Sequence, residues 1–268
     1  MNIKSDDIIY SIGDEKIRSY LAYPNDSVSH PGIVLIHEIF GLDEHIKDVT
    51  RRLADEGYVV LAPHLFSGDA FSKILTPIAI SKTMKFMMSI PVEKQRDETY
   101  RNSEMAKLSQ DEREAISNVY MTLFVNRPTN KFTEYLSGAV EFLLKQKNVN
   151  GKIGSVGFCF GGGMSINLAC DGKIDASVIF YGENPNPISK VKNVKNAVLG
   201  IYAGEDTRIT SKVPELVKEL SEAKKNISIK IYSGAYHAFF NDTRAQMYNE
   251  TSAKSAWKTL LEFYREYL

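Results

Sequence analysis

The chain has 268 residues, of which 43% are hydrophobic and 25% charged, which is enough for one large α/β domain or two small ones. Lysine plus arginine and aspartate plus glutamate each number 33, so the formal net charge is zero, and no long run of one sign occurs. This balance excludes the charge pattern typical of proteins that bind nucleic acid or anionic membranes. We therefore expect a partner that is small or nearly neutral, and neither nucleic acid nor a membrane.

The N-terminal residues contain no uninterrupted apolar segment of the kind found in signal peptides, and no stretch approaches 18 apolar residues. This pattern predicts a cytoplasmic protein. There are two cysteines, Cys159 and Cys170. If residues 160–170 are helical, the two Cα atoms lie about 16 Å apart at a rise of 1.5 Å per residue, too far for a disulfide bond. Both side chains are expected to be thiols.

The order of the predicted elements indicates the fold class. Residues 8–24 alternate in polarity around a Gly-Asp turn and predict a β-hairpin. Short apolar strands are then predicted at 32–38, 58–63, 152–158, 176–182, 197–204 and 227–234, and helices at 43–57, 133–146, 212–226 and 243–268. Continuous apolar strands that alternate with helices are typical of a parallel sheet buried on both faces. We therefore expect a doubly wound, mostly parallel α/β sheet preceded by the hairpin.

Residues 70–130 depart from this alternation, because they are rich in methionine and contain no convincing strand. A loop of that length without structure of its own would be unusual in a folded domain. We expect a helical insertion or lid at about 70–130 within a single domain that spans residues 1–268. No linker, repeat or low-complexity tract divides the chain.

The sequence "GFCFGGG", residues 157–163, joins a predicted strand to a predicted helix. Its first five residues have the form G-x-C-x-G, which is the nucleophile-elbow pattern with cysteine in the position of serine. Such a turn holds its central residue in a strained conformation above the carboxyl edge of the sheet. The N-terminus of the following helix favours a thiolate there and offers a backbone N–H to an oxyanion. By itself the motif leaves two interpretations of Cys159 open, as a nucleophile or as a small buried side chain.

A cysteine nucleophile needs a base, and the base needs an orienting acid. In α/β-hydrolases these follow in the order nucleophile, acid, histidine, each after a strand. His237 is the one histidine that follows Cys159, and it comes directly after the last predicted strand. Asp206 follows the preceding strand, with Glu205 and Glu183 as competing carboxylates. The combined order favours Cys159, Asp206 and His237 as a catalytic triad.

The segment "HEIFGL" follows the first inner strand. It does not satisfy the H-E-x-x-H metal pattern, and the glycines of residues 157–163 fit neither a dinucleotide fingerprint nor a P-loop, so no metal and no cofactor are expected. In α/β-hydrolases this loop supplies the second oxyanion N–H, which points to Ile39. Glu38 is predicted at the rim of the site with its carboxylate near the thiol, the alternative being an ordinary ion pair with an arginine or lysine.

With "HEIFGL", "GFCFGG", "GEDTRI" and "YHAFFN" all present, the chain resembles the dienelactone hydrolase family over nearly its full length. The resemblance implies an α/β-hydrolase that opens lactones, with Cys159 as nucleophile, His237 as base and Asp206 as its orienting acid. It further implies that Glu38 helps to generate the thiolate when substrate arrives, and that the backbone amides of Ile39 and Phe160 form the oxyanion hole.

The chain departs from the family pattern at the groups that bind the substrate. Well-known members have an arginine four residues after the catalytic histidine that binds the substrate carboxylate, whereas this chain has Asn241 there. Arg244, three residues further on, is the candidate substrate-binding residue. The expected reaction is hydrolysis of a lactone or small ester through a thioester. A general carboxylesterase or thioesterase, and a ligand-binding or redox-sensing protein that uses Cys159, are the alternatives. The oligomeric state stays open.

Overall fold

The structure is a computed structural model that describes residues 2–94 and 97–268. Its chain divides into two compact units, one formed by residues 1–65 and 131–268 and the other by residues 66–130. The first unit is built on a sheet of eight strands in the order β1-β2-β4-β3-β5-β6-β7-β8. The strands are β1 (Ile3–Ile12), β2 (Glu15–Pro24), β3 (His30–Ile36), β4 (Val59–Pro63), β5 (Val149–Phe158), β6 (Ala176–Phe180), β7 (Ala197–Ala203) and β8 (Ile227–Tyr232).

The sheet is parallel from β4 to β8, and the hairpin adds two antiparallel strands at one edge. β1 and β2 meet at a turn in which Gly13 has a φ of 55°, a conformation that glycine adopts without steric cost. The predicted hairpin, the six apolar strands and the mostly parallel sheet are thereby confirmed. Every residue of β4, β6 and β7 is buried, as expected for strands covered on both faces.

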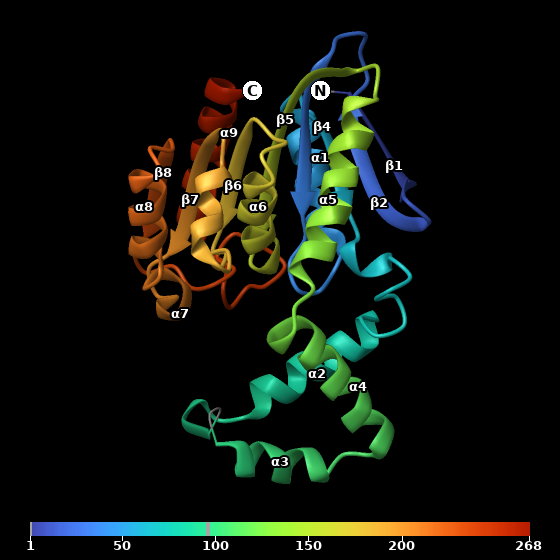
Figure 1. Cartoon of the computed structure of the whole chain (residues 1–268), viewed down its shortest axis with the longest axis vertical. Helices are drawn as coiled ribbons and strands as arrows, with labels where there is room; N and C mark the ends of the chain where they lie inside the picture. The colour runs from blue at the N-terminus through green and yellow to red at the C-terminus, as the bar shows by residue number, and fades with distance from the viewer. Residues whose placement is uncertain (1, 95–96) are drawn as a thin grey trace. The chain divides into compact units, whose positions relative to one another are not determined.

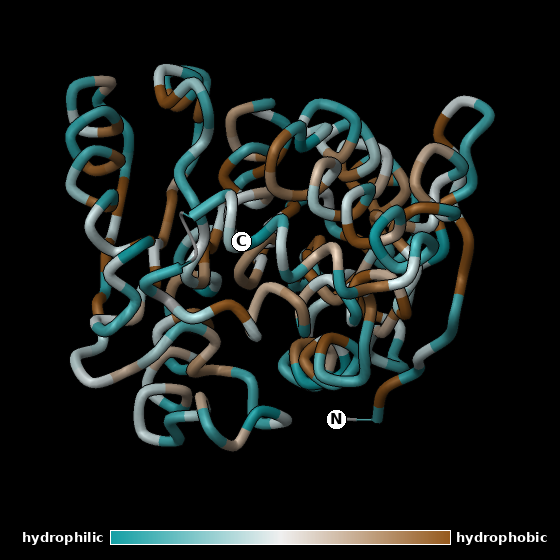
Figure 2. Tube along the Cα trace, turned by 90° about the horizontal axis from the view of Figure 1, so that it is seen from below, coloured by the Kyte–Doolittle hydropathy of each residue, from teal (hydrophilic) through white to brown (hydrophobic). Residues whose placement is uncertain are grey.

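Helices cover both faces of this sheet (Figure 1). They are α1 (Glu44–Asp55), α5 (Thr129–Leu144), α6 (Phe160–Cys170), α7 (Thr207–Thr210), α8 (Val213–Glu222) and α9 (Glu250–Tyr267), with short 3₁₀ turns at η1 (Leu65–Ser67) and η4 (Ile188–Asn193). α1 and α9 bury apolar side chains, among them Leu53 and Leu260, in one core with Phe158 and Phe180 of the sheet. α5, α6 and α8 lie on the opposite face (Figure 1). Hydrophobic and hydrophilic residues alternate along the helical coils in Figure 2, as amphipathic helices of a layered fold require.

The prediction of a helix over residues 243–268 is wrong at its start. α9 begins at Glu250, where the side chain of Asn249 caps it by accepting a hydrogen bond from the N–H of Ser252 at 3.0 Å. The preceding residues form turns, because the side-chain oxygen of Asn241 accepts hydrogen bonds from both the N–H and the hydroxyl of Thr243. This local bonding offers the backbone an alternative to a helix.

The second unit, residues 66–130, contains no strand among its described residues. Its elements are α2 (Pro77–Ser89), η2 (Val92–Lys94), α3 (Glu98–Ala106), α4 (Gln110–Tyr120) and the π-helix η3 (Met121–Val125). α2 and α4 pack together, Ile80 and Ile116 are buried on them, and Lys82 pairs with Glu112 at 3.1 Å. Figure 1 shows α2, α3 and α4 as three sides of a triangle. A cavity of about 730 Å³ lies within this unit and is lined by Met84, Met87, Met88, Met105 and Met121 among others.

Candidate active site

Cys159 occupies the sharp turn between β5 and α6. Its φ of 56° and ψ of −114° lie in a region that residues with a side chain rarely adopt. The turn is held at both ends, because the N–H of Cys159 donates to the carbonyl of Phe180 at 3.0 Å and its own carbonyl accepts from the N–H of Gly163 at 3.2 Å. The side chain is partly exposed, at the N-terminus of α6. A strained residue at a helix N-terminus matches the geometry expected from the motif.

The glycines of the motif are required by the close approach of three segments. A Cβ atom at Gly157 would lie 1.9 Å from the carbonyl oxygen of Gly161, and one at Gly161 would lie 2.2 Å from that of Ile36. Both obstacles are backbone atoms, which cannot rotate away. The elbow therefore packs against the end of β3 through Gly161, and it is hydrogen-bonded to the end of β6 through Cys159. These contacts fix the position of Cys159 relative to the loops that follow the two strands.

His237 lies between a carboxylate and the thiol. Its Nδ1 is 2.5 Å from Oδ2 of Asp206, and Cys159 is near enough to interact with the ring and raise its pKa. The side chain of Asp206 is only 7% exposed, whereas that of His237 is 30% exposed. The competing carboxylates face elsewhere: Glu205 accepts a hydrogen bond from the N–H of Gly234, and Glu183 pairs with Arg208 at 2.9 Å. Of the three candidate acids, Asp206 is the one bonded to the histidine.

The pKa of His237 reflects these neighbours. Burial lowers this pKa, but hydrogen bonds and charge interactions with Asp206 and Cys159 outweigh burial and raise it from 6.5 to about 10. The imidazolium form is therefore favoured while both partners are present. A histidine that bridges a carboxylate and a cysteine is the arrangement in which a thiol is activated as a nucleophile.

Glu38 is 1% exposed, so the prediction of a place at the rim of the site is wrong. Its Oε2 accepts a hydrogen bond from the side-chain amide of Asn241 at 3.0 Å and lies 3.5 Å from Nη2 of Arg244. Its Oε1 is buried and has no hydrogen-bond partner among the described residues. The guanidinium of Arg244 is stacked 4.2 Å over the ring of Phe40. The ion pair with an arginine, one of the two readings of Glu38, is thus present, and it explains how a buried carboxylate is tolerated.

Two backbone amides are expected to form an oxyanion hole: that of Ile39, in the loop after β3, and that of Phe160, directly after Cys159. Ile39 is buried in the loop after β3, and its N–H has no hydrogen-bond partner within the described part of the chain. Phe160 is the first residue of α6, where helix N–H groups point toward the N-terminal end of the axis. Gly161, next to Phe160, is packed against the backbone of Ile36 and His37. The two amides therefore belong to segments in direct contact.

Sequence reasoning did not identify Tyr181, which follows β6. It has a φ of 39°, is 1% exposed, and its hydroxyl lacks a hydrogen-bond partner among the described residues. Its ring lies 5.0 Å from that of His237. Burial, and then the nearby charges of Glu38 and Cys159, raise the pKa of Tyr181 well above its ordinary value. Its place directly after a buried strand, at the same sheet edge as the other candidates, is the sequence signal that would have indicated it.

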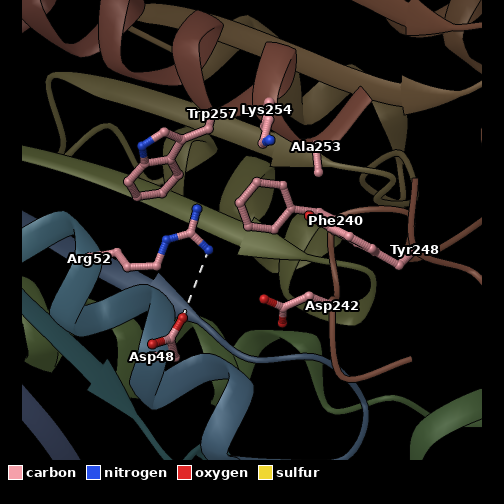
Figure 3. Close-up of a pocket in the computed structure, with 8 residues that line it drawn as sticks. All are labelled: Asp48, Arg52, Phe240, Asp242, Tyr248, Ala253, Lys254 and Trp257. Atoms are coloured by element: carbon pink, nitrogen blue, oxygen red, sulfur yellow. Dashed lines mark ion pairs between the residues drawn. The ribbon is translucent and has the colours of Figure 1, made fainter. Parts of the chain in front are cut away.

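A separate cavity of about 350 Å³ lies between α1 and α9 (Figure 3). Arg52 stands 4.4 Å over the ring of Trp257 and is also close to Phe240, while its guanidinium approaches Asp48 at 3.8 Å. None of Cys159, Asp206 and His237 lines this cavity. The arginine thus packs the two helices together, away from the candidate site.

Comparison with known proteins agrees with this geometry. The profile of the dienelactone hydrolase family matches residues 17–268. A protein from Saccharolobus solfataricus that carries a provisional name as a carboxymethylenebutenolidase is 38% identical, over 97% of both chains.

Among solved structures, a provisionally named dienelactone hydrolase from Klebsiella pneumoniae superposes with a TM-score of 0.78 at 24% identity, over the whole of both chains. A dienelactone hydrolase-like promiscuous phosphotriesterase from metagenomic libraries reaches 0.72 at 21% identity, over 99% of this chain and 98% of the other. At these identities the two structures show the shared fold, which is the α/β-hydrolase fold expected from the sequence. With the family profile covering most of the sequence, the chain belongs to the dienelactone hydrolase family and is a hydrolase of ester or lactone bonds.

Proposed function

We propose that the protein hydrolyses a lactone or small carboxylic ester through a covalent thioester on Cys159, with His237 as general base and acid and Asp206 as the residue that orients it. The observation that carries this proposal is the position of His237. Its Nδ1 hydrogen-bonds with Asp206, and the cysteine at the strained elbow is near enough to raise its pKa. A base held by an acid beside a nucleophile is the arrangement on which acyl transfer depends.

The first half of the reaction forms the thioester. The thiolate of Cys159 attacks the carbonyl carbon, a C–S bond forms, and the carbonyl electron pair moves onto oxygen. The N–H groups of Ile39 and Phe160 stabilise this oxyanion, a contribution of about 3 kcal/mol per donor in comparable enzymes. When the oxyanion collapses, the ester or lactone C–O bond breaks, and His237 gives its proton to the departing oxygen. In a lactone the departing oxygen stays attached to the acyl group.

The second half requires His237 to act as a base, and acylation makes this possible. Cys159 contributes to the raised pKa of His237 by a hydrogen bond and by its charge. A thioester sulfur has no negative charge, so this contribution disappears and the imidazole releases its proton more readily. The neutral imidazole then takes a proton from water, whose oxygen attacks the thioester. Collapse of the second oxyanion breaks the C–S bond, releases the acid and restores the thiolate.

Glu38 places a buried negative charge close to the site, and Arg244 and Asn241 stabilise that charge. In the family, the corresponding glutamate is expected to promote thiolate formation. Here its Oε2 is engaged by Arg244 and Asn241. This engagement favours a second candidate function, that of a general carboxylesterase or thioesterase. Asn241 stands in place of the family's arginine, and Arg244 is paired with Glu38, so neither of these two positions offers an unpaired cation to the carboxylate of a dienelactone-type substrate.

The reaction is tested with the full-length protein, an unsaturated lactone that carries a carboxylate, and a neutral short-chain aryl ester. Intact-protein and peptide mass spectrometry is expected to show an acyl adduct on Cys159. Cys159→Ala is expected to reduce kcat/KM by about a thousandfold or more, and His237→Ala to do the same. Preference for the aryl ester over the lactone would support the second candidate function.

Cys170 provides the matched control. It is buried on α6, and burial raises the pKa of its thiol to about 12, so it stays protonated and unreactive. Cys170→Ala is expected to leave labelling and turnover within about twofold of the wild type. The proposal is wrong if Cys159→Ala or His237→Ala turns over either substrate like the wild type.

A further inference from the structure

His37, the last residue before Glu38, is fully buried, and both of its ring nitrogens take part in hydrogen bonds. Its Nε2 lies 3.1 Å from the backbone N of Leu65, and its Nδ1 lies 2.6 Å from the carbonyl oxygen of Glu38. A backbone N–H can only donate, so Nε2 is the acceptor. The ring proton is therefore on Nδ1 and is donated to the carbonyl of Glu38.

The carbonyl that receives this proton belongs to the peptide unit whose N–H is that of Ile39. In a trans peptide the C=O and N–H point in opposite directions. The carbonyl of Glu38 also accepts from the N–H of Gly41 at 3.2 Å. Two donors thus hold the oxygen side of this peptide plane. The N–H of Ile39, which has no hydrogen-bond partner within the described part of the chain, is aimed to the other side.

The same imidazole also contacts the second segment of the proposed oxyanion hole. The ring of His37 is stacked on that of Phe160, with centroids 6.0 Å apart and an angle of 22° between the planes. The ring of Phe132 meets Phe160 edge-on at 5.5 Å. The loop beyond Ile39 is held as well: Gly41 has a φ of 87°, and a Cβ atom there would lie 3.0 Å from the ring of His64.

We propose that His37 is a positioning residue for the oxyanion hole, which orients the N–H of Ile39 through the carbonyl of the same peptide unit. The inference rests on the proposed function of Cys159, because an oxyanion arises only if a nucleophile attacks a carbonyl. Burial, and then the neighbouring His64, lower the pKa of His37 to about 3, so the ring keeps a single proton at the pH values at which thiolate chemistry proceeds. Hydrogen bonding to the carbonyl also polarises the peptide unit, which strengthens its N–H as a donor.

Two substitutions separate the two hydrogen bonds of His37. In His37→Asn the side-chain NH₂ lies near the position of Nδ1 and can still donate to the carbonyl of Glu38. In His37→Gln the side-chain oxygen can reach the position of Nε2 and accept from Leu65, but the donor to Glu38 is lost. We expect His37→Gln to lower kcat for an aryl ester about tenfold to a hundredfold, since the donor is misaligned rather than removed, while KM changes less than about threefold. His37→Asn is expected to keep kcat within about fivefold of the wild type.

Two further measurements distinguish positioning from a general structural role. A trifluoromethyl ketone adds to the thiolate of Cys159, and the resulting hemithioketal places a negatively charged oxygen in the hole. Its inhibition constant should rise in His37→Gln by the factor by which kcat falls. Alkylation of Cys159 by iodoacetamide displaces iodide without forming an oxyanion, so its rate should be the same in the wild type and both variants.

The inference is overturned if both variants lose kcat equally, or if alkylation falls together with turnover. If a variant does not fold, a measurement on the wild-type protein still tests the inference. Nitrogen-15 NMR of the histidine rings should show the proton of His37 on Nδ1, and a proton on Nε2 would contradict the inference. If the wild type hydrolysed no ester or lactone, the proposed function would fail, and ketone binding together with the NMR result would still decide the role of His37.

Discussion

At the scale of single residues, the chemistry depends on His237. Its imidazole is partly buried, which disfavours the charged form, yet Asp206 at 2.5 Å and the neighbouring Cys159 favour it more strongly. The raised pKa therefore measures how well two partners compensate for burial. Because one of these partners loses its charge during the proposed reaction, the same residue can serve as an acid in one half and as a base in the other.

This balance predicts how His237 titrates. In the wild type the imidazolium should persist up to a pH of about 10, because the raised pKa means that the proton is released only there. In Cys159→Ala one of the two groups that raise the pKa is missing, while burial still lowers it, so the titration midpoint should move to lower pH. The measurement is an NMR titration of the His237 ring protons in both proteins.

Two other histidines serve as internal references in that titration. Burial, with His64 as a neighbour, lowers the pKa of His37 to about 3, and burial together with Arg18 lowers that of His64 to about 4. Their ring signals should therefore stay constant above pH 6. A His237 midpoint near 6.5 that did not move in Cys159→Ala would show that the thiol and the imidazole are not coupled.

At the scale of elements, the elbow depends on how closely α6 approaches the ends of its neighbouring strands. Three glycines in succession follow Phe160, the first residue of the helix, and they differ in what surrounds them. A Cβ atom at Gly162 would lie 2.6 Å from the carbonyl oxygen of Phe180, whereas one at Gly163 would meet its nearest atom, the carbonyl oxygen of Glu183, at 3.4 Å. The first distance is a clash with backbone, and the second is ordinary contact.

Alanine at these two adjacent positions should therefore have opposite effects. Gly162→Ala must push α6 away from β6 and is expected to lower the free energy of unfolding by about 3 kcal/mol or more. Gly163→Ala fits the space and gains helix propensity, so we expect no change or an increase of up to about 1 kcal/mol. Equilibrium urea unfolding of the two variants provides the measurement. Equal decreases in the free energy of unfolding at both positions would mean that helix propensity or local backbone strain, rather than the contact with β6, determines the stability of the elbow.

At the scale of the whole molecule, the buried apolar surface is unevenly distributed between the two compact units. The sheet unit contains strands such as β6 that are buried along their entire length. In the unit of residues 66–130, α3 has no buried residue, and five methionines line a cavity of about 730 Å³. Methionine is flexible and fills irregular space loosely, so this unit should be the less stable of the two.

No helix among the described residues is long and apolar enough to span a membrane.

Hydrogen–deuterium exchange of the intact protein should report this difference. Amides of α3 are expected to exchange at least about a hundredfold faster than those of β6, because local opening of α3 exposes little apolar surface. Peptide-level mass spectrometry at several exchange times gives the comparison, with the buried helix α6 as a protected helical reference. Similar protection in α3 and α6 would indicate that the unit of residues 66–130 opens only together with the sheet.

Much of this protein follows from local sequence. The apolar runs of β4, β6 and β7 predict buried parallel strands, since such runs are stable only under helices on both faces. The elbow at Cys159 and the start of α6 at Phe160 follow from glycines that a sharp turn requires. The helical character of residues 70–130 was visible in the absence of strand patterns. The start of α9 was not, because the bonds of Asn241 to Thr243 break a helical pattern that composition alone suggests.

Tertiary structure decided which of these groups meet. Glu183, Glu205 and Asp206 all follow strands, and only packing at the sheet edge brings Asp206, rather than the other two, to His237. Burial of Glu38 with Arg244 joins residues about 200 positions apart in the chain, and the pairing of His37 with Leu65 depends on how two loops are held together. The catalytic roles of Cys159, His237 and Asp206 remain predictions. Sequence determines local conformation through sterics and periodicity, whereas the contacts that set charge and proton position are long-range, so only the folded chain determines them.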